Sequence, residues 1–137
     1  MRDILFKAKR LSDGAWIEGN LVSIPEDADF MPGAYILQRL VSARADPPTK
    51  GIMLGGFFEV DPSTVCQYTG LTDKNGKKIW ENDIVNHNGE YAPVKFGMYC
   101  SSFDYGSYNF GFYVDFPEET NYRKDLGYWY KKVSVIG

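Results

Sequence analysis

The chain has 137 residues, of which 44% are hydrophobic and 24% are charged, which is typical of one globular domain or one domain with a small added lobe. This composition excludes a disordered chain, and a net charge of −3 differs from the basic domains of most nonspecific nucleic-acid binders. No apolar run approaches the roughly 20 residues of a membrane span, so we expect a soluble, cytoplasmic protein. Aromatic residues make up 16% of the chain, which favours strands first and binding surfaces second.

The first third of the chain predicts a hairpin, a loop and a second apolar segment. Residues 4–9 alternate between apolar and polar side chains, and Asp13-Gly14 separates them from a second strand-like run over 16–22. Residues 25–33 are acidic and rich in turn formers, so we expect a loop. Residues 35–43 fit either a short helix or a buried strand, and their Tyr, Ile and Val residues favour the strand.

The middle of the chain contains the clearest turn signals. Residues 44–51 include two prolines and predict an exposed connector, and residues 53–60 predict another strand. In the following segment, Asp61 is placed to cap a single helical turn or a β-turn that begins with a proline. Residues 66–72 predict a strand, and Asp73-Lys74-Asn75-Gly76 predicts the turn that leads into its returning arm over 77–80.

The last third of the chain predicts four further strands. One begins at residue 83, and Asn88-Gly89 then supplies a turn. Apolar residues alternate over 92–98 and again over 108–116, and a final strand is expected over 129–136. These short strands and Gly-containing turns predict a mainly β protein, with an N-terminal β-hairpin lobe over residues 1–66 and a small barrel over residues 67–137.

Several of these segments together resemble the YopX family of phage and prophage proteins. The segments that carry the resemblance are Val60–Val65, Gln67–Leu71, Asp73–Lys77 and Glu81–Val85, supported by Phe6–Arg10 and Val135–Gly137. The resemblance implies an SH3-like small barrel in the C-terminal half and a bacterial or phage origin. It implies no activity, because none is established for the family as a class.

The chain departs from the family pattern at three places. Asn82 stands where members usually carry Gly, and Trp80 where they carry Tyr. Asn is the next-best residue to Gly at a positive φ, so a turn tolerates the first change. Members also tend to continue beyond the Val-Ile-Gly stretch, whereas this chain stops at Gly137, so it is either trimmed or a short member.

No residues predict a catalytic or metal site, and we expect no cofactor. His87 is the single histidine and stands beside a turn signal, so we expect an exposed turn residue. Cys66 and Cys100 are too few for a metal knuckle and are expected as reduced thiols. The carboxylates of Asp73, Glu81 and Asp83 would have to gather to hold Mg²⁺, whereas turn formation, ion pairing and strand-start hydrogen bonds explain them more simply.

Two surfaces remain as candidates for binding. Residues 99–116 are dense in aromatic side chains, of which Phe110, Phe112 and Phe116 are expected in the core. The others form a candidate protein-interaction surface made of Tyr99, Phe103, Tyr105, Tyr108 and Tyr113. A candidate nucleic-acid surface, in which Tyr128, Trp129 and Tyr130 are interleaved, consists of Lys74, Lys77, Lys78, Lys131 and Lys132. Lysines at hairpin tips and edge strands usually serve to block aggregation, and this explanation is favoured for the second set.

The sequence therefore predicts a non-enzymatic, phage-derived protein-interaction or assembly module of the bacterial host. Its expected partner is another protein or a second copy of itself. A small barrel that binds single-stranded nucleic acid is the alternative, and a metal-dependent nuclease ranks last.

Overall fold

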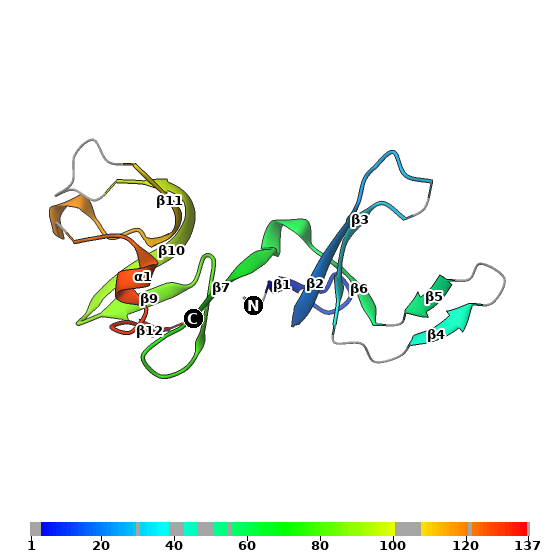
Figure 1. Cartoon of the computed structure of the whole chain (residues 1–137), viewed down its shortest axis with the longest axis horizontal. Helices are drawn as coiled ribbons and strands as arrows, with labels where there is room; N and C mark the ends of the chain where they lie inside the picture. The colour runs from blue at the N-terminus through cyan, green and yellow to red at the C-terminus, as the bar shows by residue number, and fades with distance from the viewer. Residues whose placement is uncertain are drawn as a thin grey trace. The chain divides into compact units, whose positions relative to one another are not determined.

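The computed structural model describes residues 4–29, 31–38, 43–46, 51–54, 56–100, 108–120 and 122–136. For residues 43–46, 51–54 and 118 it describes the backbone alone. The chain folds into two compact units, the first extending to Gln67 and the second beginning at Tyr68. Antiparallel strands dominate both units (Figure 1), which confirms the prediction of a mainly β protein.

The first unit is built on an antiparallel sheet with the strand order β6-β3-β2-β1. Its strands are β1 (Phe6–Lys9), β2 (Trp16–Ile24), β3 (Gly33–Leu37) and β6 (Phe57–Val60), and the first residues of β7 (Cys66–Thr72) pair with β1. Alternate residues of these strands face the core, as the period of two in a strand requires. The buried core residues of this unit are Ala8, Ile17, Ala34, Ile36 and Val60.

Gly19 lets two strands approach closely at the centre of this sheet. It pairs with Phe6 of β1, and a Cβ atom added to it would lie 2.1 Å from the carbonyl oxygen of Leu37 in β3. A real side chain cannot occupy that position, because the obstacle is backbone and not a flexible side chain. Position 19 therefore requires glycine, because the backbone of β3 leaves no room for a Cβ atom there.

The expectations for residues 35–54 are partly right. Residues 33–37 form a strand, as the Tyr, Ile and Val content favoured, while residues 39–42 lie outside the described residues. The connector expected over residues 44–51 is wrong, because β4 (Ala43–Asp46) and β5 (Gly51–Leu54) pair with each other as a hairpin. The pairing runs through Asp46 and resumes at Gly51, while the two prolines lie outside the described residues.

The 3-10 helix η1 (Pro62–Thr64) leads from the sheet of the first unit into β7. The Asp61 carboxylate caps it by accepting hydrogen bonds from the backbone N–H of Ser63 at 3.0 Å and from the Ser63 hydroxyl at 2.8 Å. The predicted capped turn is confirmed, with proline at the start of the turn where its missing N–H costs nothing.

The second unit contains a four-stranded antiparallel sheet with the order β11-β10-β9-β12. Its strands are β9 (Ile84–His87), β10 (Glu90–Tyr99), β11 (Asn109–Val114) and β12 (Ser134–Val135), and β8 (Lys78–Trp80) pairs with β7 across a register irregularity. A single core of buried residues joins these elements, made of Ile79, Val85, Ala92, Val94, Val114, Phe116, Leu126, Trp129 and Val133.

Helical turns cover one side of this core. The helix α1 (Leu126–Trp129) lies against the sheet in Figure 1 and contributes Leu126 and Trp129 to the core, and the short η2 (Glu118–Thr120) precedes it. The strand expected over residues 129–136 is therefore wrong at its start, because only Ser134 and Val135 pair, with β9. Within the described residues the sheet does not close on itself, so the SH3-like barrel stays a prediction.

Buried carboxylates hold the turns of the second unit. Asp73 accepts hydrogen bonds from the backbone N–H groups of Asn75, Lys77 and Val135, at 2.8, 2.9 and 2.8 Å, and so ties the predicted hairpin turn to β12. Asp83 accepts one from the backbone N–H of Trp80 at 2.8 Å. Asp73 therefore stabilises its turn, and Asp83 accepts a backbone hydrogen bond just before β9 begins, as the sequence predicted.

Candidate interaction surface

The hairpin of β10 and β11 has an apolar face whose residues are buried in the core at one end and exposed to solvent at the other. Val94 pairs with Val114, and both are fully buried. The next rows on the same face pair Phe96 with Phe112 and Met98 with Phe110. We call these last four residues the ribbon face.

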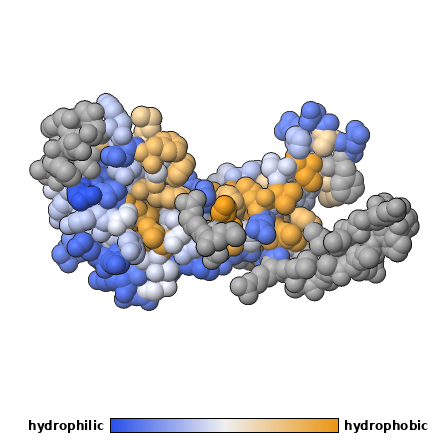
Figure 2. Space-filling model, in the orientation of Figure 1, coloured by the Kyte–Doolittle hydropathy of each residue, from blue (hydrophilic) through white to orange (hydrophobic). Residues whose placement is uncertain are grey.

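Exposure rises steadily along the ribbon face. The relative exposure is 46% for Phe96, 66% for Met98 and 71% for Phe110, and Tyr108 beyond them is 73% exposed. Figure 2 shows hydrophobic atoms gathered over the hairpin of β10 and β11. Apolar surface that is contiguous in this way marks contact sites on soluble proteins, whereas single exposed apolar residues do not.

Contacts between aromatic rings fix the side chains of the ribbon face. The ring centroid of Phe96 lies 5.1 Å from that of Phe110 and 4.8 Å from that of Phe112, in edge-on and tilted arrangements. These are the separations that aromatic pairs favour. The face is therefore already organised, so a partner that covers it has few side chains to immobilise.

The opposite face of the hairpin carries a stacked tyrosine pair. Gly97 and Gly111 are paired across the strands, and no side chain stands between Tyr99 and Tyr113. The Tyr99 and Tyr113 rings stack with centroids 4.9 Å apart. Burial raises the pKa of both phenols, and the charges of Asp125 and Asp115 raise the pKa of Tyr99 and Tyr113 respectively.

The aromatic residues singled out from the sequence fall into three groups. Tyr108 is exposed at the end of β11, whereas Tyr99 and Tyr113 are half-buried on the face opposite the ribbon face. Phe103 and Tyr105 lie outside the described residues. The structure thus places Tyr99 and Tyr113 on the face opposite the ribbon face, while Tyr108 is exposed immediately before β11.

The core positions expected from the same pattern need one correction. Phe116 is buried and Phe112 half-buried as expected, but Phe110 is exposed. Alternation shows which residues share a face, but it does not show where the covering helix ends. Phe96 and Met98 share that alternation, so the pattern that marks the ribbon face is present on both strands, whereas the core was predicted on one of them only.

The ribbon face adjoins an edge of the sheet. β11 is an outer strand, and its outer side meets the segment before α1 through the pair Tyr113–Asp125 and a hydrogen bond from the N–H of Val114 to the carbonyl of Lys124 at 2.7 Å. Both contacts lie at one end of the strand. Edge strands offer backbone donors and acceptors to a strand of another chain.

The basic candidates meet at a different place in the second unit. The N–H of Lys74 donates to the carbonyl of Val133 at 3.1 Å, which brings the turn holding Lys74 and Lys77 beside Lys131 and Lys132. All four of these lysines are exposed, as is Lys78 on β8.

Cations also lie over aromatic rings in this region. Arg123 and Lys132 lie 4.7 and 4.9 Å from the centroid of the Tyr128 ring, and Lys131 lies 5.4 Å from that of Tyr130. Trp129 is buried, so it is not one of the exposed aromatics expected there.

His87 lies in an aromatic cluster and is not an exposed turn residue. It is half-buried, and its ring centroid is 4.6 Å from that of Trp129 and 5.9 Å from that of Tyr122. The Trp129 indole N–H in turn donates to the carbonyl of Arg123 at 2.6 Å. The turn that follows begins one residue later at Asn88, whose φ of 51° is left-handed.

The residues that could bind a metal or take part in redox chemistry are placed as follows. No group of three or more His, Cys, Asp or Glu residues there could hold a metal ion. Both oxygens of Asp73 and one of Asp83 accept backbone hydrogen bonds. Cys66 is buried, Cys100 is half-buried, and neither is disulfide-bonded. Among the described helices, none is long and apolar enough to cross a membrane.

Comparisons with known proteins relate nearly the whole chain to one family. The model of a family described as YopX protein matches residues 6–137. A crystal structure of protein EF1440 from Enterococcus faecalis is similar with a TM-score of 0.52 and 20% identity, over 100% of this chain and 93% of that one. At this identity the similarity shows the fold alone. No curated protein matches the chain.

Proposed function

The chain belongs to the YopX family, and we propose that it is a non-enzymatic protein-interaction or assembly module of phage or prophage origin that acts in the bacterial cytoplasm. The observation that carries the proposal is the ribbon face, whose exposed rows continue the buried rows of the core. The family resemblance supports the proposed origin.

The energetics of the ribbon face favour a protein as its partner. Burying a Phe or Met side chain completely contributes about 1.5–3 kcal/mol. Phe96, Met98 and Phe110 are each between 46% and 71% exposed, so about half of that contribution is still available from each. Three such side chains suffice for a hot spot, because a few well-packed anchors supply most of the affinity of an interface.

A second copy of the chain is the partner to test first. The edge position of β11 offers backbone groups beside the ribbon face, and two β11 strands can pair antiparallel about a two-fold axis. The Met98–Phe110 row of each copy then lies beside the same row of the other copy, on one face of a continuous sheet. A host protein that adds a strand at this edge is the other outcome of the experiment.

Light scattering over a concentration series tests the proposal. We expect the wild-type chain to self-associate at micromolar concentration, and a variant combining Met98→Ser and Phe110→Ser to remain monomeric. Tyr91→Ser is the matched control, because Tyr91 is 58% exposed on β10 but lies on the opposite face from Met98. A monomeric wild type that also retains no host protein, or equal behaviour of the two variants, would contradict the proposal.

Binding of single-stranded nucleic acid is the second candidate function. The observation that favours it is the hydrogen bond between Lys74 and Val133, which places lysines of two turns next to each other beside exposed Tyr128. Such a surface attracts a phosphate backbone, and its affinity falls steeply with salt.

Fluorescence anisotropy with a labelled oligonucleotide in low salt tests the second candidate. We expect weaker binding after Lys74→Ala or Lys131→Ala, and unchanged binding after Lys9→Ala, an exposed lysine of the first unit. Absence of binding by the wild-type chain in low salt would eliminate this candidate.

A further inference from the structure

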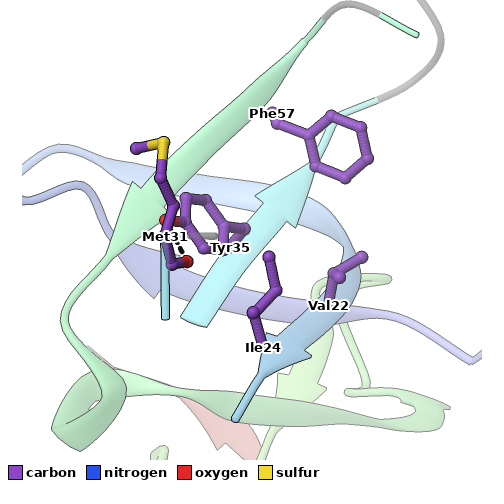
Figure 3. Close-up of a pocket in the computed structure, with 5 residues that line it drawn as sticks. All are labelled: Val22, Ile24, Met31, Tyr35 and Phe57. Atoms are coloured by element: carbon purple, nitrogen blue, oxygen red, sulfur yellow. Dashed lines mark hydrogen bonds between the residues drawn. The ribbon is translucent and has the colours of Figure 1, made fainter. Parts of the chain in front are cut away.

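The first unit contains an apolar pocket on the side of its sheet that faces away from the core. The pocket has a volume of about 410 Å³ and is lined by Val22, Ile24, Met31, Tyr35 and Phe57 (Figure 3). These residues alternate along β2, β3 and β6 with residues of the core side such as Ile36 and Phe58. The pocket is therefore independent of the hydrophobic core and of the ribbon face.

The wall of the pocket is almost wholly apolar, and its lining side chains offer a ligand no free O–H or N–H donor. Its one polar side-chain atom, the Tyr35 hydroxyl oxygen, donates its hydrogen to the carbonyl of Met31 at 2.9 Å, as the dashed line in Figure 3 shows. This bond also holds Met31 in place, although its φ of 40° is left-handed and costly for a residue other than glycine. The strained backbone presents the Met31 side chain, which is 54% exposed, over the pocket.

The loop that joins two of the pocket's lining residues is acidic. Met31 and Ile24 are joined by the loop that carries Glu26, Asp27 and Asp29, all exposed. On the other side, the Glu59 carboxylate lies beside the Tyr35 ring, since both come within 3.6 Å of a Cβ atom added at Gly33. The segment from residue 25 to 32 contains no Lys or Arg. Figure 2 shows the hydrophilic tip of this loop next to hydrophobic atoms.

We propose that this pocket binds a single large apolar side chain of a partner protein, with lysine or arginine residues on both sides of that side chain. The volume is of the size that holds compact ligands and is enough for one aromatic or long aliphatic group. The apolar wall favours an apolar side chain, because the one hydroxyl hydrogen on it is already donated to the Met31 carbonyl. The acidic loop that joins two lining residues selects basic flanks by charge complementarity.

Two short blocked peptides with a central Trp-Leu pair, one flanked by lysines and the other by glutamates, test the proposal by fluorescence anisotropy of an attached dye. We expect the lysine-flanked peptide to bind about tenfold more tightly, because a few charge pairs with the acidic loop each contribute modestly, and to bind more weakly as salt increases. Ile24→Ser is expected to abolish binding by placing a hydroxyl in the pocket. Leu11→Ser is the matched control, because Leu11 is 57% exposed in the same unit and does not line the pocket.

Charge reversal separates the contribution of the acidic loop from that of the pocket. A variant combining Glu26→Lys and Asp27→Lys leaves the apolar wall intact and should transfer the preference to the glutamate-flanked peptide. Circular dichroism of each variant checks that the sheet still forms. No binding of either peptide, or equal binding of both, would overturn the proposal. Self-association lost on Ile24→Ser would also overturn it, by assigning the pocket to a second copy. Variants of the ribbon face should leave peptide binding unchanged, so failure of one proposal is distinguishable from failure of the other.

Discussion

Replacement of Asp73 by alanine is expected to be among the most damaging single changes in the second unit. The Asp73 carboxylate is 6% exposed and accepts three backbone hydrogen bonds, two from its own turn and one from Val135. The alanine side chain accepts none of them. The change therefore loosens the predicted turn and its attachment to β12 together, although these segments are 62 residues apart in the chain.

The magnitude follows from what happens to each donor. The N–H of Val135 is part-buried, and leaving such a donor without a partner costs about 1–3 kcal/mol. The N–H groups of Asn75 and Lys77 belong to an exposed turn, where water replaces the carboxylate at a cost of about 0.5–1 kcal/mol each. We expect Asp73→Ala to lower the free energy of unfolding by about 2–5 kcal/mol, and Asp73→Asn, which keeps one acceptor, by less.

The same carboxylate makes stability depend on pH. Burial alone would raise the pKa of Asp73, but the backbone hydrogen bonds from Val135, Lys77 and Asn75, with the charge of Lys77, hold it below its usual value of 3.8. Because the folded pKa is the lower one, the carboxylate stabilises the fold fully above about pH 3.8 and loses that contribution as the pH falls through the folded pKa. The difference between wild type and Asp73→Asn should be constant at neutral pH and shrink below pH 3.8.

Urea unfolding followed by tryptophan fluorescence measures both effects. Trp80 and Trp129 are each 5% exposed in the second unit, whereas Trp16 of the first unit is 49% exposed, so the large spectral change reports the second unit. A loss below about 1 kcal/mol for Asp73→Ala would refute the reasoning, since it would mean that water satisfies all three donors. A difference between wild type and Asp73→Asn that grows on acidification would refute the pKa argument.

The remaining predictions concern packing and are measured by urea titration, followed by circular dichroism for the first-unit variant Gly19→Ala and by tryptophan fluorescence for the second-unit variants. Gly19→Ala should cost about 2–3 kcal/mol, because its Cβ would lie 2.1 Å from the carbonyl oxygen of Leu37. Gly127→Ala is the matched control and should stabilise α1 by about 0.5–1 kcal/mol, because nothing lies within 4 Å of its Cβ; a loss there would contradict the packing argument. Trp129→Phe should cost about 1–3 kcal/mol, since it leaves the part-buried carbonyl of Arg123 without its indole donor, and a neutral result would show that this bond adds nothing.

Local turn chemistry is the part of this fold that sequence reasoning predicts well. Asp61 caps η1, Asp73 organises its turn, and Asn82 has a φ of 71°, as expected where Asn stands in place of Gly. Each of these features depends on a few neighbouring residues, so the sequence window that encodes them is short. The bond from Asp73 to Val135 depends on tertiary structure and was not predictable from the turn alone.

The misses arise where distant segments decide the outcome. Tyr128 and Trp129 are aromatic residues, which are common in strands, but burial of Trp129 against the sheet favours a helical turn at these positions. The alternating pattern that contains Phe110 and Met98 correctly predicts strands. It does not show that no described element covers this pair of residues, both of which are exposed. The pocket could not be predicted from the sequence, because Met31, one of its lining residues, stands in a loop without an alternating pattern of apolar residues.

Site-specific photo-crosslinking in the bacterial cell tests the central claim most directly. A benzophenone amino acid placed at Phe110, on the ribbon face, should crosslink the chain to a second copy or to one discrete host protein. The same amino acid at Tyr91, which is 58% exposed on the opposite face of β10, should give no such product. Equal crosslinking at both positions, or none at Phe110, would contradict the assignment of the ribbon face as the contact surface.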